Sequence, residues 1–307
     1  MLRFARALLI VSLLIGISVS AAGAQGNFVP KFVNVAYAGD SIPGDVLDVY
    51  WPSNGAPPFP TVVMFTTSSG KKSDLYDEGV PQFINSLGYA AVTVSYRPAL
   101  PESYEDAFCA LAWAYQNNDQ YGLDIQETAL YGVSWGGLVA AFVGETTDNA
   151  APYLTNCPYS LPTGFFPRGV MTNSGAFLTI PDEIASFAQN GLLPDIAALP
   201  SAALDKALDT MRKTPPDQWC CLYFPNDVHD ALYELPIFHV NDHEPPFLLI
   251  QGVADTTIPY QDTLNYAQAL LDHSSDVQLD FKGTSGHIID LFPLQDTISA
   301  FLDYAFR

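Results

Sequence analysis

The sequence predicts an α/β fold in which a mostly parallel, doubly wound sheet carries a helical, cap-like insertion. Apolar runs with the character of strands alternate with helix-like segments along most of the chain, and this order favours a parallel sheet covered by helices on both faces. One such run turns directly into a helix at Gly132-Val-Ser-Trp-Gly136. Over 176–246 the alternation stops and proline and aromatic residues are frequent, so we expect the insertion there.

The first 24 residues have the pattern of a secretory signal peptide. Arg3 and Arg6 form a basic start, an apolar run follows over 7–19, and Ala22-Gly-Ala24 fits the small-residue cleavage pattern. We therefore expect cleavage after Ala24 and a secreted or periplasmic protein. A retained N-terminal anchor is the alternative, although the apolar run is short for a membrane span.

The remaining residues, 25–307, suit one large α/β domain. They hold 33 acidic residues against 10 lysines and arginines, which gives a formal charge of -23. Nucleic acids and anionic membranes attract positive surfaces, so the composition argues against both as partners. We expect neither a cofactor nor a metal, because no cysteine or histidine spacing fits a zinc site. The oligomeric state stays open.

Four cysteines in an exported chain predict disulfide bonding. Cys109, Cys157, Cys220 and Cys221 allow three pairings. Joining Cys109 to Cys157 leaves a vicinal pair, whereas the crossed pairings tie the insertion to the body of the domain. Spacing alone does not decide between them.

The elements before the serine pattern follow from apolar runs and their terminators. Strands are rich in β-branched or aromatic residues and end at proline, glycine or small polar residues. Helices repeat apolar residues at helical spacing. These patterns predict strands over 45–51, 61–66, 89–95 and 128–131, with helices near 76–87 and 104–116.

The elements after the serine pattern resume the alternation on both sides of the insertion. We expect strands over 168–173, 246–252 and 277–281, a helix over 260–272, and a closing helix that contains Ile298, Phe301 and Leu302. Within the insertion, helices are expected near 182–189 and 202–212.

The Gly-x-Ser-x-Gly pattern predicts a nucleophilic serine at a sharp turn between strand and helix. Such a turn lifts Ser134 to its apex. Gly132 and Gly136 fit this turn because side chains two residues on either side of the nucleophile would collide with neighbouring chain.

A nucleophilic serine predicts two partners downstream, because its hydroxyl needs a base and the base needs a third group that fixes its tautomer. Asp255 follows the strand over 247–251, and His287 follows the strand over 277–281. The chain order Ser, Asp, His is the one that the α/β-hydrolase arrangement requires. The alternatives are that Asp255 is an ordinary turn residue and that His243 is the base.

At these residues the chain resembles the carboxylesterases of the α/β-hydrolase superfamily, close to the hormone-sensitive-lipase-like and feruloyl-esterase-like branch. The similarity covers nearly all of the chain after the signal. It implies that Ser134 is the nucleophile, Asp255 the acid and His287 the base. The similar segments are Leu47-Asp-Val-Tyr-Trp-Pro52, Val94-Ser-Tyr-Arg-Pro98, Tyr121-Gly-Leu-Asp124 and 244–255.

One segment departs from that family's pattern. Its members usually carry His-Gly-Gly-Gly after the third strand, where backbone N–H groups stabilise the oxyanion. Here the loop is Thr67-Ser-Ser-Gly70. We expect the N–H groups of Ser68 or Ser69, with that of Trp135, to form the oxyanion hole. Three side chains where glycine is usual should narrow the acyl pocket.

The sequence therefore predicts an exported, cofactor-free serine esterase that hydrolyses a small-molecule or polymer-borne ester through an acyl-enzyme intermediate. A serine peptidase related to the prolyl-oligopeptidase catalytic domain is one alternative. A weakly active or non-catalytic binding protein with the same fold is another, and the altered oxyanion loop favours it. For Arg97, Glu102 and Asp106 we expect a structural role, either in an ion pair or as carboxylates at a helix start.

Overall fold

The computed structural model describes residues 28–38, 44–273 and 275–307. The predicted signal peptide, 1–24, lies outside them. Within the described residues, no helix combines the length and the apolar composition that crossing a bilayer requires.

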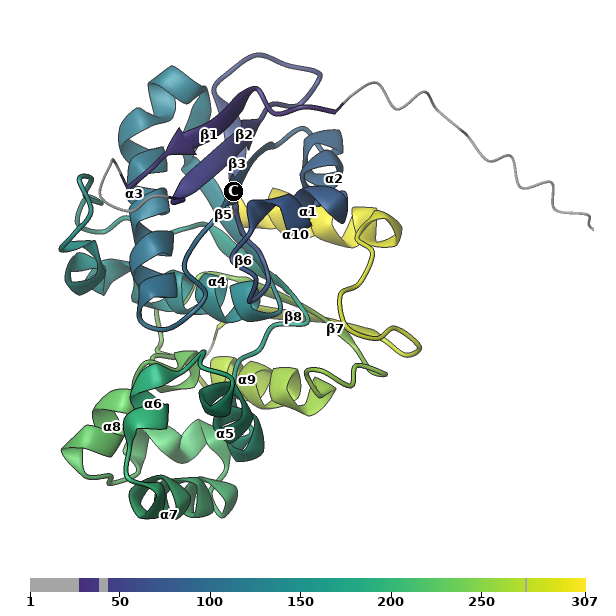
Figure 1. Cartoon of the computed structure of the whole chain (residues 1–307). Coiled ribbons are helices and arrows are strands. Elements are labelled where there is room, and N and C mark those ends of the chain that lie inside the picture. The colour runs from purple at the N-terminus through teal and green to yellow at the C-terminus, as the bar shows by residue number, and fades with distance from the viewer. Residues whose placement is uncertain (1–27, 39–43, 274) are drawn as a thin grey trace, which may run out of the picture.

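An eight-stranded sheet lies at the centre of the fold (Figure 1). Its strands are β1 (Phe32–Ala36), β2 (Val46–Tyr50), β3 (Phe59–Phe65), β4 (Ala90–Val94), β5 (Leu123–Val133), β6 (Gly169–Asn173), β7 (Phe247–Gly252) and β8 (Val277–Lys282). They are ordered β1-β2-β4-β3-β5-β6-β7-β8, and β2 is antiparallel to both of its neighbours. All neighbours from β4 to β8 are parallel, so their carboxyl ends meet at one edge of the sheet.

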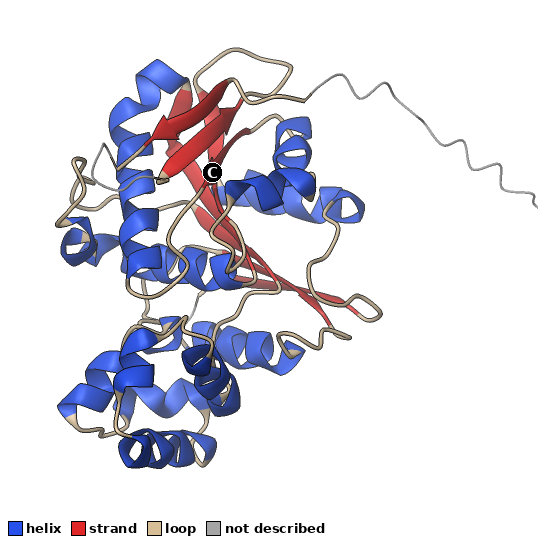
Figure 2. Cartoon of the chain, in the orientation of Figure 1, coloured by secondary structure: helices blue, strands red, loops and turns tan. Residues whose placement is uncertain are grey.

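Helices cover both faces of this sheet (Figure 2). The α-helices are α1 (Lys72–Asp77), α2 (Val80–Ser86), α3 (Glu102–Tyr121), α4 (Trp135–Thr146), α5 (Pro181–Gln189), α6 (Pro194–Ala198), α7 (Ser201–Arg212), α8 (Asn226–Leu232), α9 (Tyr260–Asp272) and α10 (Gln295–Ala305). The doubly wound α/β architecture that the sequence predicts is thereby confirmed.

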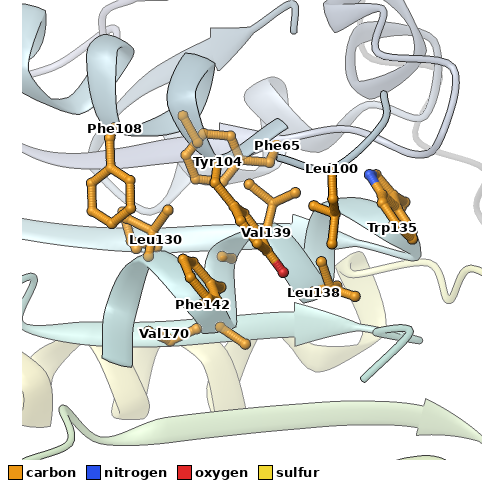
Figure 3. Packing of buried hydrophobic residues seen from close by; sticks show 14 of the residues in the cluster. Phe65, Leu100, Tyr104, Phe108, Leu130, Trp135, Leu138, Val139, Phe142 and Val170 are labelled. Atoms are coloured by element: carbon orange, nitrogen blue, oxygen red, sulfur yellow. The ribbon is translucent and has the colours of Figure 1, made fainter. Parts of the chain in front are cut away.

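The two faces of the sheet carry separate apolar cores. Helices α3, α4 and α9 contribute to one core, and α1, α2 and α10 contribute to the other. In the first core, Tyr104 of α3 stacks on Phe142 of α4 with ring centroids 3.7 Å apart (Figure 3). Helix α4 is buried along its whole length, which fits its almost entirely apolar sequence. This packing fixes the helix that follows the predicted nucleophile.

Two predicted elements differ from the structure. The single helix expected near 76–87 is two helices, α1 and α2, because Gly79 between them adopts a φ of 75° and Pro81 lies in the first turn of the second one. The strand expected over 128–131 extends over Leu123–Val133, since its first half pairs with the beginning of β3.

The segment between β6 and β7 contains the helical region that the sequence predicts as an insertion. It holds α5 to α8, of which α6 and α8 were not predicted because each spans two turns or fewer. These helices lie together beside α9 (Figure 1). Their apolar side chains continue the core of α3 and α4, so the segment packs as part of the same body.

A disulfide bond joins Cys109 of α3 to Cys157, with a Cα–Cα distance of 5.5 Å. It connects α3 to the segment that follows a 3-10 turn over Ala151–Leu154. The structure therefore contains the bond from Cys109 to Cys157, and not a bond that would tie Cys109 to the predicted insertion.

Replacing both Cys109 and Cys157 by alanine should lower the free energy of unfolding by about 2–4 kcal/mol. The bond closes a loop with a sequence separation of 48, and removing it frees the unfolded chain. Guanidinium unfolding of the wild type and the double variant measures the difference. Equal midpoints with equal slopes would contradict the expectation.

Candidate active site

Ser134 lies at the apex of a strained turn between β5 and α4. Its backbone has φ 55° and ψ -119°, a conformation that costs a non-glycine residue on the order of 1–3 kcal/mol. The Ser134 N–H donates to the carbonyl of Asn173 at 3.0 Å. The Ser134 carbonyl accepts from Gly137 N–H at 2.9 Å and Ala176 N–H at 3.0 Å. The strained conformation is thus fixed by hydrogen bonds on both sides of the residue.

The two glycines around Ser134 are required by close backbone approach. A Cβ atom on Gly132 would lie 1.9 Å from the carbonyl oxygen of Gly136. On Gly136, a Cβ atom would lie 2.2 Å from the carbonyl oxygen of Thr66 and 2.3 Å from that of Phe65. No side chain fits at either position, which confirms the reason for the predicted glycines.

Asp255 and His287 form a hydrogen bond beyond the ends of β7 and β8. The distance from His287 Nδ1 to Asp255 Oδ2 is 2.8 Å. The other carboxylate oxygen of Asp255 accepts from the N–H groups of Thr257 at 2.8 Å and Ile258 at 3.0 Å. We infer that Nδ1 of His287 carries the proton of this bond, which leaves a lone pair on Nε2.

Hydrogen bonding keeps Asp255 ionised. Burial alone would raise the pKa of this carboxyl, but the hydrogen bonds from His287, Ile258 and Thr257 outweigh it and hold the pKa below its ordinary value. The Asp255 side chain is fully buried, whereas that of His287 is 20% exposed. A buried carboxylate therefore contacts an imidazole that is partly exposed to solvent.

The carboxyl ends of the parallel strands bring these residues to one edge of the sheet. Ser134 follows β5, Asp255 follows β7 and His287 follows β8. Three of the other histidines have side-chain partners elsewhere: His239 contacts the carbonyl of Tyr233, His273 lies 2.9 Å from Asp242, and His229 lies 3.3 Å from Asp230. His243, the alternative base, lies in the turn before β7 at a surface hollow with His273.

Gln251 is a member of this site that sequence reasoning missed. It is fully buried in β7, and its amide nitrogen donates to Asp255 Oδ2 at 3.1 Å. Its amide oxygen accepts from the hydroxyl of Thr263 at 2.9 Å. A polar residue at the end of an otherwise apolar strand is the sequence signal that could have indicated it.

The loop after β3 is held against the turn at Ser134. The hydroxyl of Tyr96 donates to the carbonyls of Thr66 at 2.5 Å and Thr67 at 3.0 Å. Gly70 ends the loop with a φ of 66°, and its N–H donates back to Thr67. Together with the close approach of Gly136 to Thr66, these bonds place the loop beside the predicted nucleophile.

The two serines of this loop differ in their hydrogen bonding. The Ser69 N–H donates to Thr67 Oγ1 at 3.3 Å, and its hydroxyl donates to Asp74 at 2.6 Å. Among the described residues, the N–H of Ser68 has no hydrogen-bond partner.

Trp135 connects the turn to its surroundings through its side chain. The ring is completely buried, its Nε1 donates to the hydroxyl of Ser103 at 3.1 Å, and it stacks on Phe187 with centroids 5.6 Å apart. Figure 3 shows the ring beside Leu100 and Leu138. Because Phe187 belongs to α5, this contact joins the predicted insertion to the residue after Ser134.

A second carboxylate ties the start of the predicted insertion to α9. Asp262 is fully buried and accepts from the N–H groups of Phe177, Leu178 and Thr179 at 2.6–3.2 Å. Glu183 of α5 faces the same region: burial and the charges of Asp262 and Asp255 raise its pKa to about 9.

The ion pairs of Arg97 stand apart from this site. Arg97 forms ion pairs with Asp106 at 2.7 Å and Glu105 at 3.0 Å, and Glu102 lies in the first turn of α3, so the structural roles expected for this segment are confirmed. The described part of the chain has no group of three or more histidine, cysteine, aspartate or glutamate side chains that could hold a metal ion.

Comparison with known proteins gives a family and several structural neighbours. The BD-FAE family model matches residues 47–270. Esterase LipC of Mycobacterium tuberculosis is 26% identical over 289 residues, which cover 89% of this chain and 65% of LipC, so the chain spans less than two thirds of that relative.

A truncated form of carbohydrate esterase from gut microbiota has a TM-score of 0.67 at 18% identity, over 90% of this chain and 95% of that one. An acetyl ester-xyloside bifunctional hydrolase from Caldicellulosiruptor lactoaceticus has a TM-score of 0.63 at 17% identity, over 91% of this chain and 98% of that one. These structures share the fold of this chain.

Gly136→Ala should destabilise the protein by about 1–3 kcal/mol or more, because the new Cβ atom overlaps two backbone carbonyls that cannot rotate away. Thermal unfolding measures the loss as a lower Tm. Gly283→Ala is the matched control, since a Cβ atom there meets no atom within 4 Å. Equal melting temperatures of the two variants would contradict the packing described for Gly136.

Asp255→Asn should lower the free energy of unfolding at pH 7 and lower it less in acid. The folded pKa of Asp255 lies below its unfolded value of about 3.9, so the carboxylate stabilises the fold above that pH, and this contribution is lost as the pH falls through the folded pKa. Urea unfolding at neutral and acidic pH measures the change. Asp205→Asn, at an exposed carboxylate, controls for the lost charge. An equal loss of unfolding free energy at both pH values would contradict the lowered pKa of Asp255.

Proposed function

The chain belongs to the BD-FAE family and has the α/β-hydrolase fold, and we propose that it is an exported serine esterase that hydrolyses carboxylic esters through an acyl-enzyme intermediate. The observation that carries this proposal is the 2.8 Å hydrogen bond between His287 and the ionised Asp255, at the same sheet edge as the strained Ser134. Esterase LipC and the two structural neighbours, all named as ester hydrolases, support the same activity.

In the proposed acylation step, Ser134 is the nucleophile and His287 is the base. Nε2 of His287 takes the hydroxyl proton as Ser134 Oγ bonds to the ester carbonyl carbon. Asp255 holds the imidazole in the required tautomer and stabilises the imidazolium that forms. The imidazolium then gives its proton to the leaving alcohol, and the carbon–oxygen bond to that alcohol breaks.

In deacylation, water attacks the acyl-enzyme with His287 again as the base. The bond between Ser134 and the acyl carbon breaks, Ser134 recovers its proton, and a carboxylic acid leaves. Hydrolysis therefore needs no cofactor in this scheme.

The proposed oxyanion hole consists of backbone N–H groups from the loop after β3 and from the start of α4. We assign the role to Ser68 and Trp135, because the Ser69 N–H donates within its own loop. Each such donor contributes on the order of 3 kcal/mol to transition-state stabilisation. The hydroxyl of Ser69 then has a supporting role, since its bond to Asp74 fixes the loop.

We propose that residues 176–246 form a cap over this site and that the acyl group is small. The stacking of Trp135 on Phe187 supports the cap, because it joins α5 to the residue after the nucleophile. The loop beside the turn carries the side chains of Thr67, Ser68 and Ser69 where glycine is usual in the similar esterases, which supports a narrow acyl pocket. The names of the two structural neighbours make acetyl groups on carbohydrates the first substrates to test.

Ser134→Ala and His287→Ala should each lower kcat for p-nitrophenyl acetate by about 10⁴-fold or more, and Asp255→Asn by somewhat less. Ser86→Ala, at an exposed serine of α2, should leave it unchanged. A fluorophosphonate probe should label the wild type at Ser134 and fail to label Ser134→Ala. Full turnover by both the Ser134 and the His287 variant would exclude the mechanism, and an unlabelled wild type would favour a non-catalytic binding protein.

A series of p-nitrophenyl esters of increasing chain length, together with acetylated xylo-oligosaccharides and a feruloyl ester, measures the specificity. We expect kcat/KM to fall as the acyl chain lengthens beyond a few carbons, because the loop side chains limit the pocket. A maximum at long chains would contradict the narrow pocket while leaving the triad intact.

A further inference from the structure

Asn173, the last residue of β6, forms a two-way hydrogen bond with the loop that carries His287. Its amide nitrogen donates to the carbonyl of Ile289 at 2.8 Å, and its amide oxygen accepts from the N–H of Ile289 at 3.0 Å. Asn173 is almost completely buried. We propose that Asn173 is a positioning residue, which holds the His287 loop in register with the turn at Ser134.

The same residue also contacts the turn itself. The backbone carbonyl of Asn173 accepts the N–H of Ser134 at 3.0 Å, and Asn173 pairs with Val133 in the sheet. Its amide nitrogen makes a further, longer bond to the hydroxyl of Tyr131 at 3.3 Å. One residue therefore connects the nucleophile's turn through its backbone to the base's loop through its side chain.

His287 is held on two sides, and Asn173 supplies the second. Before His287, the carbonyl of Ser285 accepts the N–H of Ala254, and Gly252 packs so closely that a Cβ atom there would lie 2.2 Å from the carbonyl of Gly286. After His287, Ile288 adopts a φ of 60°, which strains a β-branched residue. The bonds from Asn173 to Ile289 follow immediately and hold that strained conformation in place.

An amide is the group that this position requires. Ile289 presents an N–H donor and a C=O acceptor side by side, and a carboxamide offers the matching acceptor and donor in one plane. Alanine would leave both backbone groups unpaired in the interior. Aspartate has the same size but, as a carboxylate, cannot donate to the carbonyl of Ile289.

The effect on catalysis rests on the proposed function, whereas the effect on the His287–Asp255 bond does not. The first measurement is therefore the proton resonance of His287 Nδ1–H by NMR, assigned by its disappearance in Asp255→Asn. In Asn173→Ala and Asn173→Asp this resonance should shift or be lost, because the loop no longer holds the imidazole against Asp255. Aspartate keeps the volume of the side chain and so provides a test if alanine prevents folding.

The matched control is Asn85→Ala. Asn85 is another buried asparagine whose amide donates to two backbone carbonyls, those of Tyr50 and Tyr89. It belongs to α2, and Tyr89 directly precedes β4, so these bonds lie away from the carboxyl ends of the parallel strands. The Asn85→Ala variant should lose about as much free energy of unfolding as Asn173→Ala. The resonance of His287 should be unchanged in this variant.

The second measurement separates kcat from KM on p-nitrophenyl acetate. The Asn173 variants should lose about 10- to 100-fold in kcat with KM within about twofold of the wild type, while Asn85→Ala stays within about twofold in both. Asn173 variants that keep the wild-type resonance, or that keep kcat at the level of Asn85→Ala, overturn the proposal. If the wild type hydrolyses no ester, the proposed function fails and the resonance alone decides the role of Asn173.

Discussion

The strained backbone of Ser134 is the constraint on which the rest of the structure depends. A residue with a φ of 55° and a ψ of -119° stays in that conformation only where its surroundings hold it there. The surroundings here are the bonds to Asn173, Gly137 and Ala176 and a turn so tight that a glycine is required on each side. The apolar packing of α4 then fixes the direction in which the turn leaves the sheet.

The parallel sheet supplies the second requirement, which is a common edge. Because β5 to β8 run in the same direction, loops that are far apart in the sequence meet where these strands end. Hydrogen bonds between the loops set the finer positions: Gln251 orients Asp255, Asp255 orients His287, and Asn173 joins the loop of His287 to the turn at Ser134. The candidate site is thus a network of buried polar groups above an apolar sheet.

Three residues of the site could be predicted from the sequence because each has a local signature. Ser134 lies between glycines at a change from strand to helix, and Asp255 and His287 follow apolar strands in the expected order. For Asn173 and Gln251 the only signal is a polar residue at the end of an apolar strand, which fits many roles. The division of the first helix at Gly79 was missed because the apolar pattern continues across it.

The sequence by itself determined the α/β class, the order of the strands along the chain and the residues that could form a serine, histidine and aspartate site. These depend on periodicity, turn chemistry and glycine, which act within a few residues. Only the tertiary structure decided the pairing of Cys109 with Cys157, the burial of Trp135 against Phe187 and the contact of Asn173 with Ile289. Each of these contacts joins residues that are 48 or more positions apart in the sequence. Such contacts form only when the sheet and its helices pack together.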